Sequence, residues 1–178
     1  MNVDPDSSQV HCLIAPEELA RRVRELAAQI SVDYAGKQPI VVGVLKGAFV
    51  FMADLVRQLT IPVQCDFVLV SSYGQALQPS GPVKLRLDLS LPVSGHDLLL
   101  VEDIIDTGHT IPFLMEHLLK KNPASIRLCT LLDKPYRRQV PVRIDYCGFT
   151  VPDNFIVGYG IDCGEDFREL PWVGWVEE

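Results

Sequence analysis

The sequence predicts an α/β protein with a mainly parallel β-sheet flanked by helices. Strand-like and helix-like segments alternate between residues 39 and 132, which is the order expected of βαβ units. Several strand-like segments are continuous apolar runs, as in strands buried on both faces. Polar residues follow several of these strands, and ligands of such sheets bind at the carboxyl ends of strands. These polar residues are therefore expected to converge on one edge of the sheet.

The first part of the chain predicts a helix, a strand and a second helix. Pro16 suits a first helical turn, and apolar residues then recur at helical spacing until Gly36 ends the segment. Residues 39–45 form an apolar run that predicts a buried strand. After an interruption at Lys46-Gly47, helical spacing of apolar residues predicts a helix over residues 49–59.

The middle and last parts of the chain predict further strands and one more helix. Residues 63–70 predict a strand, residues 71–82 a loop rich in Gly and Pro, and residues 84–90 an alternating strand with one wet face. The remaining segments are strands at 98–103, 126–132 and 142–149, a helix at 109–121 and a mixed tail. With 178 residues and no repeat or linker, one domain over residues 1–178 is expected.

Composition argues against several classes of protein. The formal net charge is −7, whereas a nucleic-acid binder normally carries a basic face. No apolar run approaches the ~18 residues that indicate a membrane span, and the polar start lacks the features of a signal peptide. Five cysteines without a CxxC pair predict reduced, buried thiols in a cytoplasmic protein. The basic cluster of Lys134, Arg137 and Arg138 is interpreted as a solvated face.

Residues 98–110, LLLVEDIIDTGHT, carry most of the chemical information. A buried strand runs into Glu102 and Asp103, Asp106 follows, and a small polar turn leads into a helix. Unpaired N–H groups at a helix start suit a phosphate. Carboxylates beside a phosphate need a hard cation such as Mg²⁺, held by one or two carboxylates, water and substrate oxygens. The alternative is that Asp106 or Thr107 merely caps the helix while Glu102 and Asp103 are solvated.

The stretch VEDIIDTGHT resembles the phosphoribosyl-diphosphate motif of type I phosphoribosyltransferases. Four further segments, in the same order, resemble the hypoxanthine-guanine branch of that family. They are GVLKGAFVFMADL (43–55), SSYG (71–74), LLDKP (131–135) and VPDNFIVGYGIDCGEDFREL (151–170). The resemblance covers nearly the whole chain, from about residue 11 to residue 176, and a match of five segments is specific where any one alone would be weak.

The resemblance implies a type I phosphoribosyltransferase fold, with a small hood from about residues 1–14 and 135–178 and a mobile lid over about residues 71–84. The implied activity is purine salvage: Mg²⁺-dependent transfer of a 5-phosphoribosyl group from phosphoribosyl diphosphate to hypoxanthine, and to guanine. IMP or GMP and diphosphate are the products. Relatives are cytoplasmic homodimers or homotetramers, so the same is expected here, with no nucleic-acid or membrane partner.

The resemblance also implies roles for the acids and the turn. Asp106 aligns with the general base at the purine N7, and Glu102 and Asp103 with the acids that hold the ribose hydroxyls and Mg²⁺. The 5′-phosphate cradle aligns with Thr107, Gly108, His109 and Thr110. His109 stands where mammalian enzymes have lysine, so only its backbone amide is expected to contribute.

Diphosphate is expected to contact Lys46, Gly47 and Arg168, and the Leu45–Lys46 peptide is often cis in relatives. Without the family, Lys46-Gly47 would be interpreted as an ordinary turn. Asp162 aligns with a second Mg²⁺ ligand, whose carbonyl also meets a purine 2-amino group.

The purine site aligns with a lysine, an aromatic ring and a backbone carbonyl. Lys134 aligns with the residue that donates to the oxygen at C6, so 6-oxopurines are expected over adenine. Phe155 aligns with the ring that stacks on the purine, although by itself it would be interpreted as a core residue. Ile156 offers its carbonyl to the base. Ser72 and Tyr73 begin the lid, for which an untethered surface loop is the alternative.

Two other functions stay open from the sequence. An RNA-binding regulator uses the same fold in one branch of the superfamily, but the acidic charge weighs against it. A catalytically silent nucleotide-binding paralogue is disfavoured because Asp106 is present. The preference among hypoxanthine, guanine and xanthine is left open.

Overall fold

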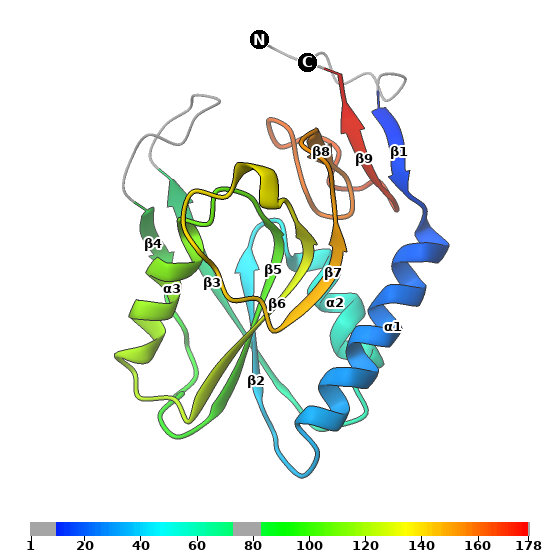
Figure 1. Cartoon of the computed structure of the whole chain (residues 1–178). Coiled ribbons are helices and arrows are strands. Elements are labelled where there is room, and N and C mark those ends of the chain that lie inside the picture. The colour runs from blue at the N-terminus through cyan, green and yellow to red at the C-terminus, as the bar shows by residue number, and fades with distance from the viewer. Residues whose placement is uncertain (1–9, 73–82, 178) are drawn as a thin grey trace.

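The main sheet of the computed structural model, which describes residues 10–72 and 83–177, has six strands in the order β4-β3-β2-β5-β6-β7. Only the β3–β4 pair is antiparallel, and the other neighbours are parallel. The fold-class prediction is therefore confirmed (Figure 1). The strands are β2 (Ile40–Leu45), β3 (Gln64–Ser72), β4 (Val83–Leu87), β5 (Asp97–Ile105), β6 (Ser125–Asp133) and β7 (Tyr146–Thr150).

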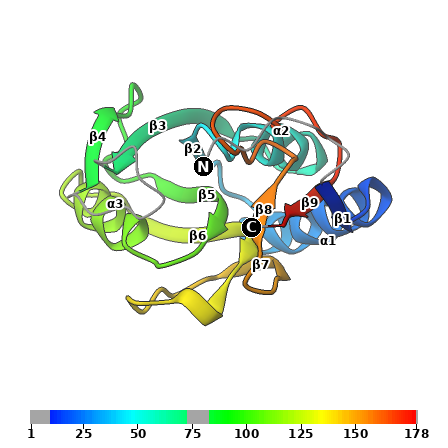
Figure 2. The ribbon, with the colours of Figure 1, turned by 90° about the horizontal axis from the view of Figure 1, so that it is seen from above.

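Helices cover both faces of this sheet. α1 (Pro16–Asp33) and α2 (Phe49–Gln58) pack on one face, and α3 (Thr110–Leu119) packs on the other (Figures 1 and 2). Alternate residues of β5 serve the two cores: Leu98 and Leu100 face α3, while Leu99 and Val101 face α1 and α2. A strand buried on both faces has no polar alternation, which is why β5 is a continuous apolar run.

A second, antiparallel sheet joins the two ends of the described chain. Its strands are β1 (Val10–Ile14), β9 (Val173–Val176) and β8 (Phe155–Val157), in the order β1-β9-β8. In Figure 1 this sheet lies at the end of the main sheet toward which β2 points. Figure 2, seen from above, shows β8 and β9 beside the ends of β5 and β6. The second sheet thus stands near the edge where ligands of a parallel sheet bind.

The start of β7 differs from the sequence-based expectation. A strand was expected from residue 142, but β7 begins at Tyr146. The preceding segment contains the short 3₁₀ helix η2 (Pro135–Arg137). Beyond it, Gln139 and Val140 donate their N–H groups to the carbonyl of Thr107, and Val142 and Ile144 pack against the core beside α3.

The cysteine prediction is partly wrong. All five thiols are free, and Cys129 is buried as expected, but Cys12 and Cys65 are exposed. Both lie in strands, whose successive side chains point to opposite faces, and these two point outward. Within the described part of the chain, none of the helices is long and apolar enough to cross a membrane.

Candidate active site

The end of β5 leads into a polar turn with a small cavity. Glu102 and Asp106 line this cavity of about 100 Å³ together with backbone and side chains of Thr107, Gly108 and Thr110. His109 is exposed and its Nε2 lies 2.9 Å from Gln139 Oε1. The turn therefore lines a small cavity at the carboxyl edge of the sheet, immediately before α3.

The helix-capping alternative for Asp106 and Thr107 is wrong. The N-cap residue of α3 is His109, and no side chain makes a capping hydrogen bond there. Asp106 and Thr107 precede the cap and belong to the cavity instead. Their carboxylate and hydroxyl therefore remain available to a ligand.

Glu102 and Asp103 are held in surroundings that disfavour negative charge. Burial, followed by the charge of Asp103, raises the pKa of Glu102 well above its ordinary value. Burial also raises the pKa of Asp103 to about 6, against the opposing effect of hydrogen bonds from backbone N–H groups and the charge of Arg168. In the absence of a cation, part of the negative charge at this strand end is suppressed.

A second cluster surrounds Asp103 and joins it to Gly47. A Cβ atom at Gly47 would overlap the carboxylate of Asp103, and one at Gly160 would overlap the carbonyl of Gly47. Gly47 therefore allows a close approach that a larger residue would block. The peptide between Leu45 and Lys46 is cis. Asp103 also senses the charges of Arg168 and Asp162.

Charged side chains next to Gly47 already pair with one another. Arg168 Nη2 lies 2.8 Å from Asp162 Oδ1 and 3.1 Å from Glu165 Oε2. Lys46 Nζ lies 3.0 Å from both oxygens of Glu165. Glu165 thus bridges two cations that the sequence predicts to contact diphosphate. It was not singled out from the sequence, because an acid in a loop has no distinguishing spacing.

Lys134 and the start of β8, which are predicted to bind a purine, lie next to each other, whereas Asp162 pairs with Arg168. Lys134 is only 4% exposed, and its Nζ donates to Asn154 O at 2.8 Å and pairs with Asp153 Oδ1 at 2.9 Å. The adjacent residues Phe155 and Ile156 form β8, with Ile156 buried and Phe155 partly buried. Lys134 and the start of β8 are therefore neighbours, although about 20 residues separate them in sequence.

The interpretation of Lys134, Arg137 and Arg138 as a solvated face is wrong for two of them. Lys134 is buried, and the side chain of Arg138 is 16% exposed because it pairs with Asp133 and with the turn. Arg137 is more exposed, with its Nε 3.9 Å from Asp106 Oδ1. A lysine and an arginine separated by three residues gave no sequence signal for burial.

Three buried side-chain atoms in the described residues have no hydrogen-bond partner: Glu102 Oε2, Asp106 Oδ1 and Arg168 Nε. All three belong to residues predicted for the site. Buried polar groups are nearly always paired, and exceptions mark strain, catalysis or a missing ion. Of the predicted lid residues, Ser72 ends β3, whereas Tyr73 lies outside the described residues.

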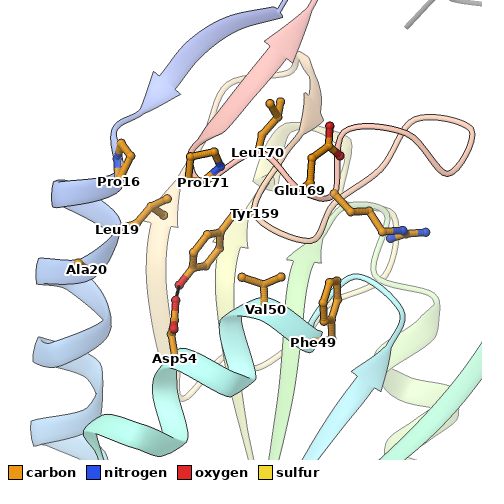
Figure 3. A pocket seen from close by; sticks show the side chains of 11 residues that line it. Pro16, Leu19, Ala20, Phe49, Val50, Asp54, Tyr159, Glu169, Leu170 and Pro171 are labelled. Carbon is orange, nitrogen blue, oxygen red and sulfur yellow. Dashed lines mark hydrogen bonds between the residues drawn. The ribbon is translucent and has the colours of Figure 1, made fainter. Parts of the chain in front are cut away.

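A larger cavity of about 660 Å³ lies away from the acids, between α1, α2 and the segment 168–171. Figure 3 shows Tyr159 pointing into it from one side and Phe49 and Val50 from α2, with the Tyr159 hydroxyl donating to Asp54. Apart from Arg168 it shares no residue with the predicted site, and its lining is mostly apolar. Among the described residues of its lining, Arg168 is the only basic one, and the rest offers little to a sugar phosphate.

The acids near the end of β5 fit a hard cation. Glu102 Oε2 is a buried acceptor without a donor, and the partly buried Asp103 carboxylate lies close to Glu102. A bound cation would remove the penalty for charging both groups. Within residues 10–72 and 83–177, however, no three His, Cys, Asp or Glu side chains are close enough to hold a metal by themselves. Water and substrate oxygens would have to complete the coordination, as is common for Mg²⁺.

The acidic end of β5, the turn and the start of α3 lie together at the carboxyl edge of a parallel sheet, where phosphorylated ligands of such sheets bind. The phosphoribosyl transferase domain model matches residues 13–163. The chain belongs to this phosphoribosyl transferase family. The resemblance inferred from the five motifs is thereby confirmed.

Named relatives lie in one branch of the family. The hypoxanthine-guanine phosphoribosyltransferase of Bacillus subtilis is 45% identical over 162 residues, covering 91% of this chain and 90% of that protein. That of Aquifex aeolicus is 47% identical over 167 residues, covering 93% and 94%. The bifunctional protein TilS/HprT of Listeria innocua is 46% identical over 162 residues, but the match spans only 25% of that protein.

Solved structures agree with this placement. A crystal structure of a hypoxanthine-guanine phosphoribosyltransferase from Bacillus anthracis superposes with a TM-score of 0.89 at 47% identity, covering 94% of this chain and 98% of that one. A hypoxanthine phosphoribosyltransferase from Staphylococcus aureus gives a TM-score of 0.91 at 35% identity, covering 99% and 97%. The two-sheet architecture is thus shared with enzymes of this branch.

Proposed function

We propose that this protein is a purine-salvage enzyme that transfers a 5-phosphoribosyl group from phosphoribosyl diphosphate to hypoxanthine, and to guanine. The bond between C1 of the ribose and the diphosphate oxygen breaks, and its electron pair leaves with diphosphate. A purine nitrogen bonds to C1, and the purine gives up its proton at N7 to Asp106. IMP or GMP and diphosphate are formed.

One observation carries this proposal furthest. Among the described residues, three buried side-chain atoms have no hydrogen-bond partner. Glu102 Oε2 can accept from a hydroxyl or bind a cation, Asp106 Oδ1 can accept a proton, and Arg168 Nε can donate a hydrogen bond to an anion. A transfer that neutralises a leaving diphosphate and removes a purine proton needs all three kinds of group. That these three atoms make no hydrogen bond within the protein is accounted for if substrate supplies their partners.

The residues around the turn are assigned to base catalysis and to the 5′-phosphate. Asp106 accepts the proton of the purine through a carboxylate oxygen that has no other hydrogen bond. The backbone of residues 107–110, together with the hydroxyls of Thr107 and Thr110, receives the phosphate at the start of α3. The side chain of His109 is engaged with Gln139, which supports a role for its amide alone.

Diphosphate is assigned to the cluster around Gly47. Lys46, the peptide of Gly47 and Arg168 receive it, and an Arg donor fork suits phosphate oxygens. Glu165 occupies both cations in the ligand-free molecule, so diphosphate displaces it on binding. Ser72 and Tyr73 are assigned to a lid loop of about residues 71–84 that closes over the site and excludes water; residues 73–82 of this loop lie outside the described residues.

The purine is assigned to the pocket between Lys134 and β8. Lys134 Nζ donates to the oxygen at C6, Phe155 stacks on the ring, and the carbonyls of Ile156 and Asp162 meet the base edge. The ammonium selects an acceptor at C6, so adenine, which presents an amino group there, is excluded. The terminal segments, about 1–14 and 135–178, are assigned to the hood, of which residues 1–9 and 178 lie outside the described residues.

Mg²⁺ is the proposed cofactor, with Glu102, Asp103 and Asp162 as the residues that would hold it. When bound, it neutralises charge on the diphosphate and ribose oxygens. The chain's own contribution is to present carboxylates whose charging the fold otherwise disfavours. Glu102 and Asp103 also orient the ribose hydroxyls.

Chelation of divalent cations with EDTA is expected to abolish turnover, and added Mg²⁺ to restore it. In Glu102→Gln combined with Asp103→Asn, calorimetric titration with Mg²⁺ and phosphoribosyl diphosphate should show at least tenfold weaker binding. Asp97→Asn is the control, because Asp97 begins β5 at its opposite end. Equal affinity in the double variant and the control would contradict the metal assignment.

The function is tested by incubating the protein with phosphoribosyl diphosphate, Mg²⁺ and one base at a time. Hypoxanthine is expected to give IMP and guanine to give GMP, with adenine inert and xanthine as the third comparison. A monophosphate formed only from another base would contradict the purine assignment. Retention of RNA that weakens with salt, without turnover, would favour the regulator instead.

The remaining partners and surroundings are inferred from the family. We infer a cytoplasmic enzyme that assembles as a homodimer or homotetramer and has no nucleic-acid or membrane partner. Sedimentation at several protein concentrations distinguishes these assemblies from a monomer.

A further inference from the structure

Arg138 donates hydrogen bonds to the backbone where β5 leads into the turn of residues 106–109. Its Nε donates to the carbonyl of Asp106 at 2.9 Å, and its Nη2 donates to the carbonyl of Ile105 at 3.1 Å. The same Nη2 pairs with the carboxylate of Asp133, the last residue of β6. One planar guanidinium therefore ties two consecutive carbonyls of the turn to the end of a buried strand.

The two residues after Arg138 also bind a carbonyl of the turn. Gln139 N and Val140 N donate to the carbonyl of Thr107 at 2.9 and 3.1 Å. A Cβ atom at Gly108 would lie 2.6 Å from the Val140 carbonyl and 2.9 Å from Arg138 Cδ. The segment 138–140 thus touches three successive carbonyls and the glycine that follows them.

The contacts from residues 138–140 to these carbonyls also determine where the N–H groups of the turn point. In a trans peptide the C=O and N–H point in opposite directions. Carbonyls 105, 106 and 107 all face the segment 138–140, so the N–H groups of Asp106, Thr107 and Gly108 face the other way. Among the backbone hydrogen bonds between described residues, none uses the N–H of Thr107 or Gly108.

We propose that Arg138 is a positioning residue for the 5′-phosphate. Anchored by Asp133, it holds the turn so that its backbone N–H groups are aimed at a phosphate before the ligand arrives. This inference rests on the proposed function, in which residues 107–110 form the phosphate cradle. Arg138 itself touches no substrate, and its effect passes entirely through the carbonyls of Ile105 and Asp106.

The chain offers a matched control in Arg22. Its Nε and Nη2 donate to the consecutive carbonyls of Gly148 and Cys147 at 2.9 and 2.7 Å. Arg22 therefore makes the same kind of double contact, but to β7 rather than to the turn. A variant at Arg22 reports the general cost of losing an arginine that binds backbone carbonyls.

The test compares affinities for IMP and for inosine, which lacks the phosphate, in the wild type, Arg138→Met, Arg138→Lys and Arg22→Met. Arg138→Met is expected to weaken IMP at least tenfold and inosine less than twofold. Arg138→Lys, which cannot span both carbonyls and Asp133, should fall between. Arg22→Met should keep the wild-type ratio. In turnover, Arg138→Met should raise KM for phosphoribosyl diphosphate more than it lowers kcat.

Asp133→Asn keeps Arg138 but removes its anchor, and is expected to shift the IMP-to-inosine ratio in the same direction by a smaller factor. The proposal is overturned if Arg138→Met keeps the wild-type ratio, loses both ligands equally, or behaves like Arg22→Met. A wild type that binds inosine as tightly as IMP contradicts the phosphate cradle itself, and so separates failure of the proposed function from failure of this inference.

Discussion

Replacing Asp106 by asparagine is expected to lower kcat by about 10²–10⁴, because a positioned general base typically contributes that factor. Asparagine keeps the size of the side chain but its amide takes up no proton. In the wild type Asp106 Oδ1 has no hydrogen-bond partner, so the substitution breaks no hydrogen bond at that oxygen and loses only the 3.9 Å ion pair with Arg137. The affinity for IMP should therefore change much less than kcat does.

Steady-state kinetics with saturating substrates, together with titration of IMP, measure this split. Asp145→Asn is the control: Asp145 accepts a hydrogen bond from Leu128 N near the beginning of β6, far from the turn along that strand. The Asp145 variant should keep kcat within a few-fold of the wild type. If Asp106→Asn also stays within tenfold, the proton acceptor lies elsewhere. If the wild type turns over and Asp106→Asn binds IMP without turnover, the catalytically silent alternative is excluded for the wild type.

Replacing Lys134 by glutamine is expected to lower kcat/KM for hypoxanthine by about 10–100-fold, since a hydrogen bond to a charged group is worth ~1.5–3 kcal/mol. Lys134 Nζ is buried and held by Asn154 O and Asp153 Oδ1, so its donors are aimed before a base arrives. Glutamine offers an acceptor as well as a donor. The preference for hypoxanthine over adenine should therefore narrow.

Competition between hypoxanthine and adenine for limiting phosphoribosyl diphosphate measures that preference. Lys121→Gln is the control, because Lys121 also pairs with an aspartate, Asp88, at 2.8 Å, but lies just beyond α3. The control should leave the preference unchanged. If Lys134→Gln keeps the preference for hypoxanthine over adenine, Lys134 does not select the base, and the selection must come from β8 and the carbonyls of neighbouring residues.

Much of the fold could be predicted because its signals are local. The apolar run that ends just before Glu102 predicts a strand buried on both faces, and the 3.6-residue spacing of apolar residues after Thr110 predicts α3. Both follow from which faces of an element are covered. Strand 142–149 was predicted too long, because the alternating apolar residues Val142 and Ile144 pack against the core beside α3 without pairing as a strand, and pairing with β6 begins only at Tyr146.

The sequence by itself determined the family, the position of the acids after β5 and the residue types available to a sugar phosphate, since these depend on short motifs in a stated order. Only the tertiary structure decided which of these groups are buried, paired or unpaired. Arg138 and Lys134 look like surface cations in the sequence, yet Lys134 is buried and Arg138 is mostly covered, each beside partners that the folded chain places next to it. The physical reason is that the cost of burying a charge, and the partner that offsets it, depend on three-dimensional neighbours and not on the residue's own spacing.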